Sequence, residues 1–148
     1  MSRGIADRAS AAPSPTPYPD LNAVLADLTA SLQTVIGAGL AGVYLQGSFA
    51  IGCFDPHSHV DFIVALRQEL TAGQVAALNE MHTRIYQGTC PWAQHLEGSY
   101  FPVDVLRDRA QAGQPLWYLE HGSQTLERSN HCNTVVVRWT LRHHGVTL

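Results

Sequence analysis

The chain has 148 residues, 45% of them hydrophobic and 14% charged, and its net charge at pH 7 is −3. This length supports one hydrophobic core and is short for two, and no uninterrupted apolar run reaches the roughly 20 residues of a membrane-spanning helix. The slight acidity argues against a broad nucleic-acid-binding face, and three cysteines without a CxxC pair indicate a reducing, cytoplasmic setting.

The first half of the chain alternates helical and strand patterns. Residues 1–19 are rich in Ala, Ser and Pro, which predicts a flexible leader before a single domain over residues 20–148. Apolar residues spaced three and four apart predict a helix over residues 20–36, with Asp20 as its cap. The apolar runs 40–45 and 60–66 predict two buried strands.

The second half continues the alternation. Helical spacing returns over residues 71–86, where Thr71 is the expected cap. Beyond it we predict a third strand within 91–100, a short helix over 103–111, a hairpin from 116–119 and 125–126, a helix over 130–144, and the start of a strand at 146–148. Together these elements predict an α/β (α+β) fold, in which helices flank a small mixed β-sheet.

The most informative segment runs from Val43 to Leu66 and reads VYLQGSFAIGCFDPHSHVDFIVAL. It contains an apolar run, the Gly47-Ser48 pair, a polar loop, and a second apolar run that begins near His59 and Asp61. Side chains two apart on a strand point to the same face. Asp61 and His59 should therefore lie together beside the Gly-Ser turn, in an arrangement typical of a phosphate-and-metal site.

This segment resembles the signature of the DNA polymerase beta-like nucleotidyltransferases, in which a strand, Gly-Ser, a spacer and Asp-x-Asp follow one another. The closest resemblance is to the aminoglycoside adenylyltransferases. It implies that Gly47 and Ser48 contact the nucleotide phosphates, with Ser58 touching phosphate or shaping the loop. It also implies that Asp61 is the second Asp of the motif, and Glu97 a third carboxylate that completes the metal site or takes the proton of the substrate hydroxyl.

The implied activity is transfer of a nucleotidyl group, AMP from ATP in the first instance, to a hydroxyl of a small molecule such as an aminoglycoside. The implied cofactor is Mg²⁺, held by His59, Asp61 and Glu97. The sequence has His59 where the motif has its first Asp, and Mg²⁺ prefers oxygen ligands. We therefore expect activity with Mg²⁺ to be weakened or absent, with Mn²⁺ as the alternative ion because it accepts imidazole more readily.

The resembled enzymes continue with a helical domain, whereas this sequence matches only their N-terminal lobe. A second copy of the chain or a helical partner protein is the expected cover for the lobe. Two alternative functions stay open. One is a non-catalytic nucleotide-binding or interaction module, and the other is the nucleotidyltransferase half of a toxin–antitoxin pair.

Other polar residues have simpler interpretations. Cys53, His57, His59 and Asp61 include plausible zinc ligands, but their spacing is a poor match to known zinc motifs. Five histidines remote from the motif are expected at the surface or at helix ends; these are His82, His121, His131, His143 and His144.

Overall fold

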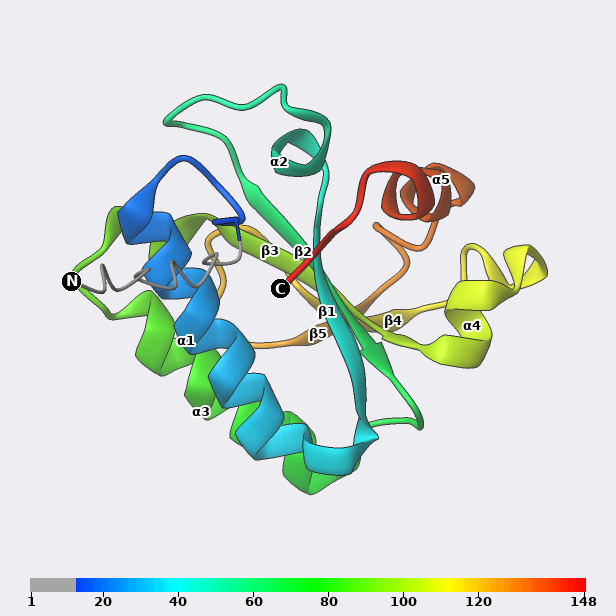
Figure 1. The fold of residues 1–148 in the computed structure, drawn as a ribbon. Coiled ribbons are helices and arrows are strands. Elements are labelled where there is room, and N and C mark those ends of the chain that lie inside the picture. The colour runs from blue at the N-terminus through cyan, green and yellow to red at the C-terminus, as the bar shows by residue number, and fades with distance from the viewer. Residues whose placement is uncertain (1–12) are drawn as a thin grey trace, which may run out of the picture.

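The computed structural model describes residues 13–148. Within this range the strands are β1 (Leu40–Gln46), β2 (Val60–Leu66), β3 (Leu96–Pro102), β4 (Leu116–Leu119), β5 (Glu127–Ser129) and β6 (Val146–Thr147). They form one mixed sheet in the order β5-β4-β3-β2-β1-β6, and helices cover both of its faces (Figure 1). The predicted α/β architecture with a mixed sheet flanked by helices is confirmed.

The central strand β2 pairs differently with its two neighbours. It runs antiparallel to β1, and Gln46 is opposite Asp61. It runs parallel to β3, and Asp61 is opposite Glu97. The other three pairings, β3 with β4, β4 with β5 and β1 with β6, are antiparallel. The two acidic residues therefore occupy matching positions on adjacent central strands.

Two long helices, α1 (Pro19–Ile36) and α3 (Ala72–Tyr86), cover one face of the sheet (Figure 1). The α1 side chains at positions 21, 25, 28 and 32 are almost completely buried, as their helical spacing predicts. Thr71 caps α3 in a capping box with Gln74, which confirms that expectation. The prediction that Asp20 caps α1 is wrong. The N-cap of α1 is Tyr18, and the Asp20 carboxylate accepts a hydrogen bond from the Leu21 amide.

The opposite face carries a smaller apolar cluster. Ile63, Phe101 and Leu116 pack there against side chains of α4 (Val103–Arg107) and α5 (Val135–His144). Because side chains alternate along a strand, Phe62 and Val64 join the core under α1 and α3, whereas Asp61 shares the face of Ile63. The same alternation puts Glu97 on the face of Phe101. Both carboxylates thus belong to the α4/α5 side of the sheet.

Several predicted boundaries change. Residues Pro91–His95 form a 3₁₀ helix rather than part of a strand, and α5 begins at Val135 rather than at residue 130. The helix expected over 103–111 is split into α4 and a 3₁₀ turn, Arg109–Gln111. The strand β5 follows the predicted 125–126 segment instead of including it. A short helix, α2 (Ser48–Ile51), occupies the place of the expected Gly-Ser turn, and η1 (Gly37–Gly39) follows α1.

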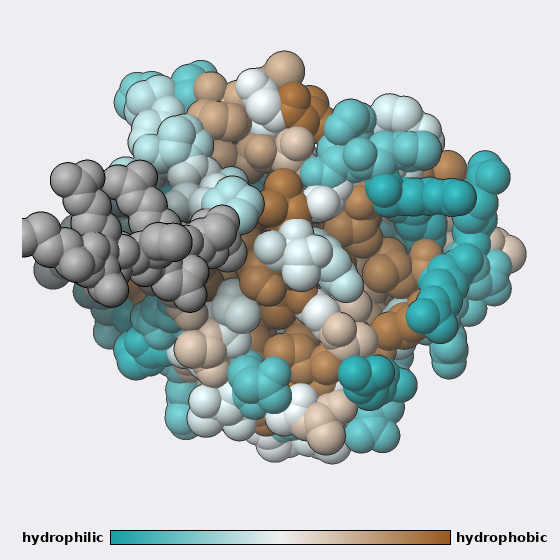
Figure 2. Space-filling model, viewed as in Figure 1, coloured by the Kyte–Doolittle hydropathy of each residue, from teal (hydrophilic) through white to brown (hydrophobic). Residues whose placement is uncertain are grey.

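Helix α1 also has the length and composition of a membrane span. Its window Pro19–Gly39 has 21 residues and a mean hydropathy of 1.2, so the sequence expectation that no segment qualifies was too strict. Core helices share these properties, and one face of α1 is packed within this fold. Figure 2 shows apolar residues near the middle of the viewed face and hydrophilic residues around its rim.

The segment before α1 makes defined contacts where it is described. The Thr16 hydroxyl donates to the Asn22 side chain over 2.7 Å, and the Tyr18 ring packs against Phe49, Phe54 and Trp92. Residues 1–12 of the predicted leader lie outside the described residues. The leader as a whole stays a prediction.

His82 was expected at the surface or at a helix end, and that expectation is wrong. It lies inside α3 with 2% of its surface exposed, and its Nε2 is 2.6 Å from the Tyr100 hydroxyl. Burial lowers the pKa of His82 to about 4, because the charged imidazolium is poorly solvated there. The folded protein therefore holds this ring neutral.

This burial predicts acid sensitivity. An imidazole whose pKa is lower in the folded than in the unfolded state stabilises the fold above about pH 6.5, and this stability is lost as the pH falls toward 4. The loss should reach about 2 to 3 kcal/mol near pH 4.5. Urea unfolding at pH 6.5 and at pH 4.5 should show a smaller decline in the free energy of unfolding for His82→Gln than for the wild type. A matched change at the exposed His57, His57→Gln, should keep the wild-type decline, and equal declines in all three proteins would contradict the assignment.

Candidate functional site

The site is centred on Asp61 and Glu97, which face each other from β2 and β3. Their parallel register places the two carboxylates on one face of the sheet, near the ends at which both strands begin. Only 13% of the Glu97 side chain is exposed. Two partly buried carboxylates this close repel each other unless a proton or a cation lies between them.

The protonation of Asp61 reflects this repulsion. Burial, followed by the negative charge of Glu97, raises the pKa of Asp61 to about 6, while His59 acts in the opposite direction. Asp61 consequently takes up a proton in mildly acidic solution. A divalent cation at the same place would relieve both effects, so the pair has the electrostatics of a cation site.

Gly47 lies directly against Asp61. Its φ of 67° and ψ of −147° belong to a backbone region that only glycine adopts readily. A Cβ atom added here would approach the Asp61 Oδ2 atom to 2.3 Å. Glycine at this position therefore allows the chain to turn from β1 into α2 while the Asp61 carboxylate stays beside the bend.

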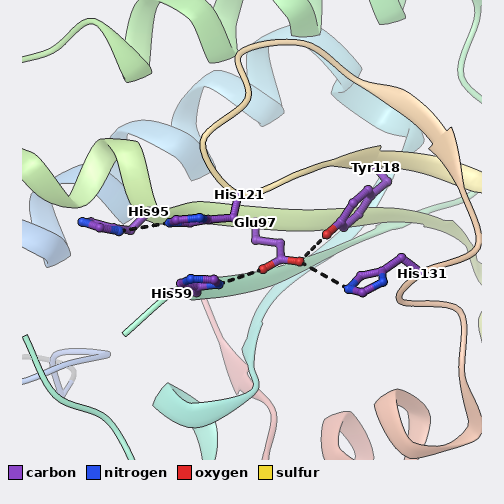
Figure 3. A network of polar contacts seen from close by, with 6 residues as sticks. All are labelled: His59, His95, Glu97, Tyr118, His121 and His131. Carbon is purple, nitrogen blue, oxygen red and sulfur yellow. Dashed lines mark hydrogen bonds and ion pairs between the residues drawn. The ribbon is translucent and has the colours of Figure 1, made fainter. Parts of the chain in front are cut away.

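The Glu97 carboxylate is held by side chains from three other segments (Figure 3). The Tyr118 hydroxyl, on β4, donates a hydrogen bond to Oε1. The Nδ1 atom of His59, just before β2, lies 3.2 Å from Oε2. The Nε2 atom of His131, in the turn before α5, lies 3.9 Å from Oε1. These contacts fix the orientation of Glu97, whereas Asp61 has no comparable set of hydrogen-bond partners among residues 13–148.

A row of histidines continues from this carboxylate. The His59 ring stacks on His121 with ring centres 3.7 Å apart, and the His121 Nε2 is 3.1 Å from the His95 Nδ1 (Figure 3). Burial, followed by the neighbouring imidazoles, lowers the pKa of His121. Protonation of one ring thus disfavours protonation of the next.

A polar cavity of about 360 Å³ adjoins Glu97. Its walls come from the starts of β2 and β3, from β4 and β5, and from the segments that follow these two. Three of the residues are acidic; the lining is His59, Glu97, Tyr118, Glu120, His121, Glu127, Ser129 and His131. Such a cavity is suited to a small polar molecule, and its acidic wall favours a cationic one.

The predicted site residues fall into two groups. The structure brings Gly47, His59, Asp61 and Glu97 together. Ser48 begins α2 directly after Gly47, and its side chain makes no hydrogen bond within the described residues. Ser58 shapes the loop, because its hydroxyl accepts from the Asp55 amide over 2.9 Å. Phosphate binding by these two serines stays a prediction.

Sequence reasoning missed the contributions of Tyr118, His121, His131 and Cys132, whose Sγ atom lies within 4.8 Å of the Glu97 carboxylate. His121 and His131 were assigned to the surface or to helix ends. The His131 side chain is indeed 69% exposed, yet its ring is next to Glu97. The position of Tyr118 was predictable from the sequence. It is two residues after Leu116 on β4, so the two side chains share one face of the sheet. The other three depend on how the chain returns after β4 and β5.

Comparison with known proteins adds no relative. No protein-family model matches the chain, and no curated protein matches it.

The contact between Gly47 and Asp61 predicts that a methyl group added at residue 47 strongly destabilises the fold. Gly47→Ala should lower the free energy of unfolding by about 2 to 4 kcal/mol, because it adds a clash to an unfavourable backbone conformation. Gly52→Ala is the matched control: Gly52 also has a positive φ, but an added Cβ meets nothing within 4 Å, so its cost should be about 1 to 2 kcal/mol. In an Asp61→Ala background, Gly47→Ala should cost less. Equal costs in both backgrounds, measured by urea unfolding, would refute the contact.

The raised pKa of Asp61 predicts a pH-dependent effect of Asp61→Asn. A carboxyl whose pKa is higher in the folded state stabilises the fold below about pH 4, and this contribution is lost as the pH rises through about 6. We therefore compare the change in the free energy of unfolding that Asp61→Asn causes at pH 8 and at pH 4, both without metal ions. The change at pH 8 should be more stabilising than the change at pH 4 by on the order of 1 to 2 kcal/mol. Asp104→Asn, at an exposed position, should show no such difference. A pH-independent effect of Asp61→Asn would contradict the assignment.

Proposed function

We propose that this chain is a nucleotidyltransferase-like domain that transfers a nucleotidyl group, AMP from ATP as the first candidate, to a hydroxyl of a small molecule. The observation that carries the proposal is the facing pair of Asp61 and Glu97 with the Gly47 bend against it. The mixed sheet flanked by helices agrees with the fold that the sequence resemblance implies.

The proposed reaction needs a base and a place for the acceptor. The acceptor hydroxyl oxygen forms a bond to the α-phosphorus, the bond between this phosphorus and the bridging oxygen breaks, and pyrophosphate leaves. Glu97 takes the hydroxyl proton, with Tyr118 and His59 fixing its direction. The adjoining cavity offers room for an acceptor beside Glu97, and its acidic wall suits a cationic aminoglycoside.

The residues present fit a divalent cation. Asp61 and Glu97 supply two carboxylates whose mutual repulsion a cation would relieve, and the His59 imidazole lies just before the start of β2. When bound, such an ion neutralises phosphate charge and aligns the reacting groups. Only two of these three groups are oxygen donors, so the set suits Mn²⁺ better than Mg²⁺.

One observation favours the non-catalytic alternative. His59 occupies the position of the motif's first Asp, and its Nδ1 contacts the same Glu97 that would act as base. A base already engaged in a hydrogen bond is less able to accept a proton. Under this alternative the chain binds nucleotide without turnover. ATP binding in calorimetry without pyrophosphate release would favour it.

Variants of the two motif positions test the proposal. With ATP, Mn²⁺ or Mg²⁺ and a panel of aminoglycosides, Glu97→Gln should lower the rate of pyrophosphate release about 100-fold or more, because the base is lost. Glu80→Gln, an exposed position on α3, is the matched control and should keep the wild-type rate. His59→Asp should raise the Mg²⁺-supported rate about tenfold or more, because it restores an anionic oxygen ligand. Absence of ATP binding in both the wild type and His59→Asp would overturn the proposal.

A further inference from the structure

A second group of metal-ligating atoms lies beside Glu97. The donor atoms of Glu97, His131 and Cys132 are all within 4.8 Å of one another. Among residues 13–148, this is the only group of three His, Cys, Asp or Glu side chains that meets this distance. It shares no residue with Cys53, His57, His59 and Asp61, the plausible zinc ligands that lie close together in the sequence.

The fold holds this group from several sides. Glu97 is on β3 and is oriented by Tyr118, whereas His131 and Cys132 are consecutive residues in the turn between β5 and α5. Before the two residues, the Ser129 hydroxyl accepts from the His131 amide over 3.1 Å. The turn that carries both ligands is therefore fixed where it leaves the sheet.

The end of the turn is equally well held. The buried Asn133 donates from its side-chain amide to the Gln111 and Gln114 carbonyl oxygens over 3.0 Å and 2.8 Å. The Thr134 hydroxyl then accepts from the Val137 amide and caps α5. These bonds tie the turn to the segment between α4 and β4, so little conformational freedom remains to be lost when a ligand binds.

The chemistry of the donors selects the ion. A thiolate, an imidazole and a carboxylate are the ligands of zinc, whereas Mg²⁺ takes oxygen donors. In a zinc site the ligand atoms lie about 3 to 4 Å apart, because each is about 2.0 to 2.3 Å from the metal. The exposed His131 ring has room to close the remaining distance. Three protein ligands also leave the fourth tetrahedral position for water or a substrate atom.

We propose that Glu97, His131 and Cys132 bind one zinc ion and leave its fourth coordination position open. This site goes beyond the proposed nucleotidyl transfer and does not rest on it, because zinc binding needs neither ATP nor an acceptor. Since Glu97 belongs to both sites, an ion held by His131 and Cys132 engages the carboxylate that the transfer reaction would use as base.

The experiment uses the full chain, reduced and free of metal, with Zn²⁺ or Co²⁺ alone as the probe. Competition with a chromophoric chelator should give a stoichiometry of one zinc per chain. Cys132→Ser should weaken zinc binding about 100-fold or more, and His131→Gln about tenfold or more, because loss of even an outer partner of a metal ligand costs about 10- to 100-fold. With Co²⁺, the wild type should show a near-ultraviolet thiolate-to-metal charge-transfer band that Cys132→Ser lacks.

Two controls remove the simplest artefacts. Cys53→Ser and His143→Gln alter an exposed cysteine and an exposed histidine outside the group, and they should keep both the affinity and the band. Thermal unfolding of each variant without metal establishes that it is folded. A wild type that binds no zinc, or a Cys132→Ser variant with unchanged affinity, would overturn the proposal. Loss of transferase activity with zinc binding intact would bear on the proposed function alone.

Discussion

The repulsion between Asp61 and Glu97 is the constraint around which this side of the molecule is built. Parallel pairing of β2 and β3 puts the two acids opposite each other, where burial raises the pKa of Asp61 to about 6. A fold selected for stability alone would place apolar side chains there, as it does two residues further along the same face at Ile63. The two carboxylates therefore agree with the proposed binding of positive charge, by a cation, a cationic substrate or both.

The sequence predicts the parts of this arrangement that depend on short segments. Apolar periodicity identifies α1 and α3, the apolar run identifies β2, and alternation places Asp61 on a defined face. The burial of His82 was also predictable, because it is four residues after Leu78 and three before Ile85 on the inner side of α3. Its residue type, rather than its position, led to the wrong expectation.

The remaining parts depend on long-range pairing. β5 is short, polar and exposed, so no hydrophobic pattern marks it, yet its pairing with β4 brings the following turn and His131 to Glu97. The contribution of Cys132 depends on the same return of the chain. A 3₁₀ helix over 91–95 moves the start of β3 to Leu96, which sets the register of Glu97 against Asp61. Sequence order alone gives neither result.

The short helix α2 connects this region to an aromatic cluster. Ser48 follows the bend, and the next residue, Phe49, packs edge-on against Trp92 with ring centres 5.7 Å apart. Phe54, from the loop after α2, stacks on Phe49 with ring centres 4.8 Å apart. A shift of the bend therefore changes the surroundings of a buried indole. Once Trp117 and Trp139 are replaced, the fluorescence of Trp92 would therefore report on events beside Gly47 without an added label.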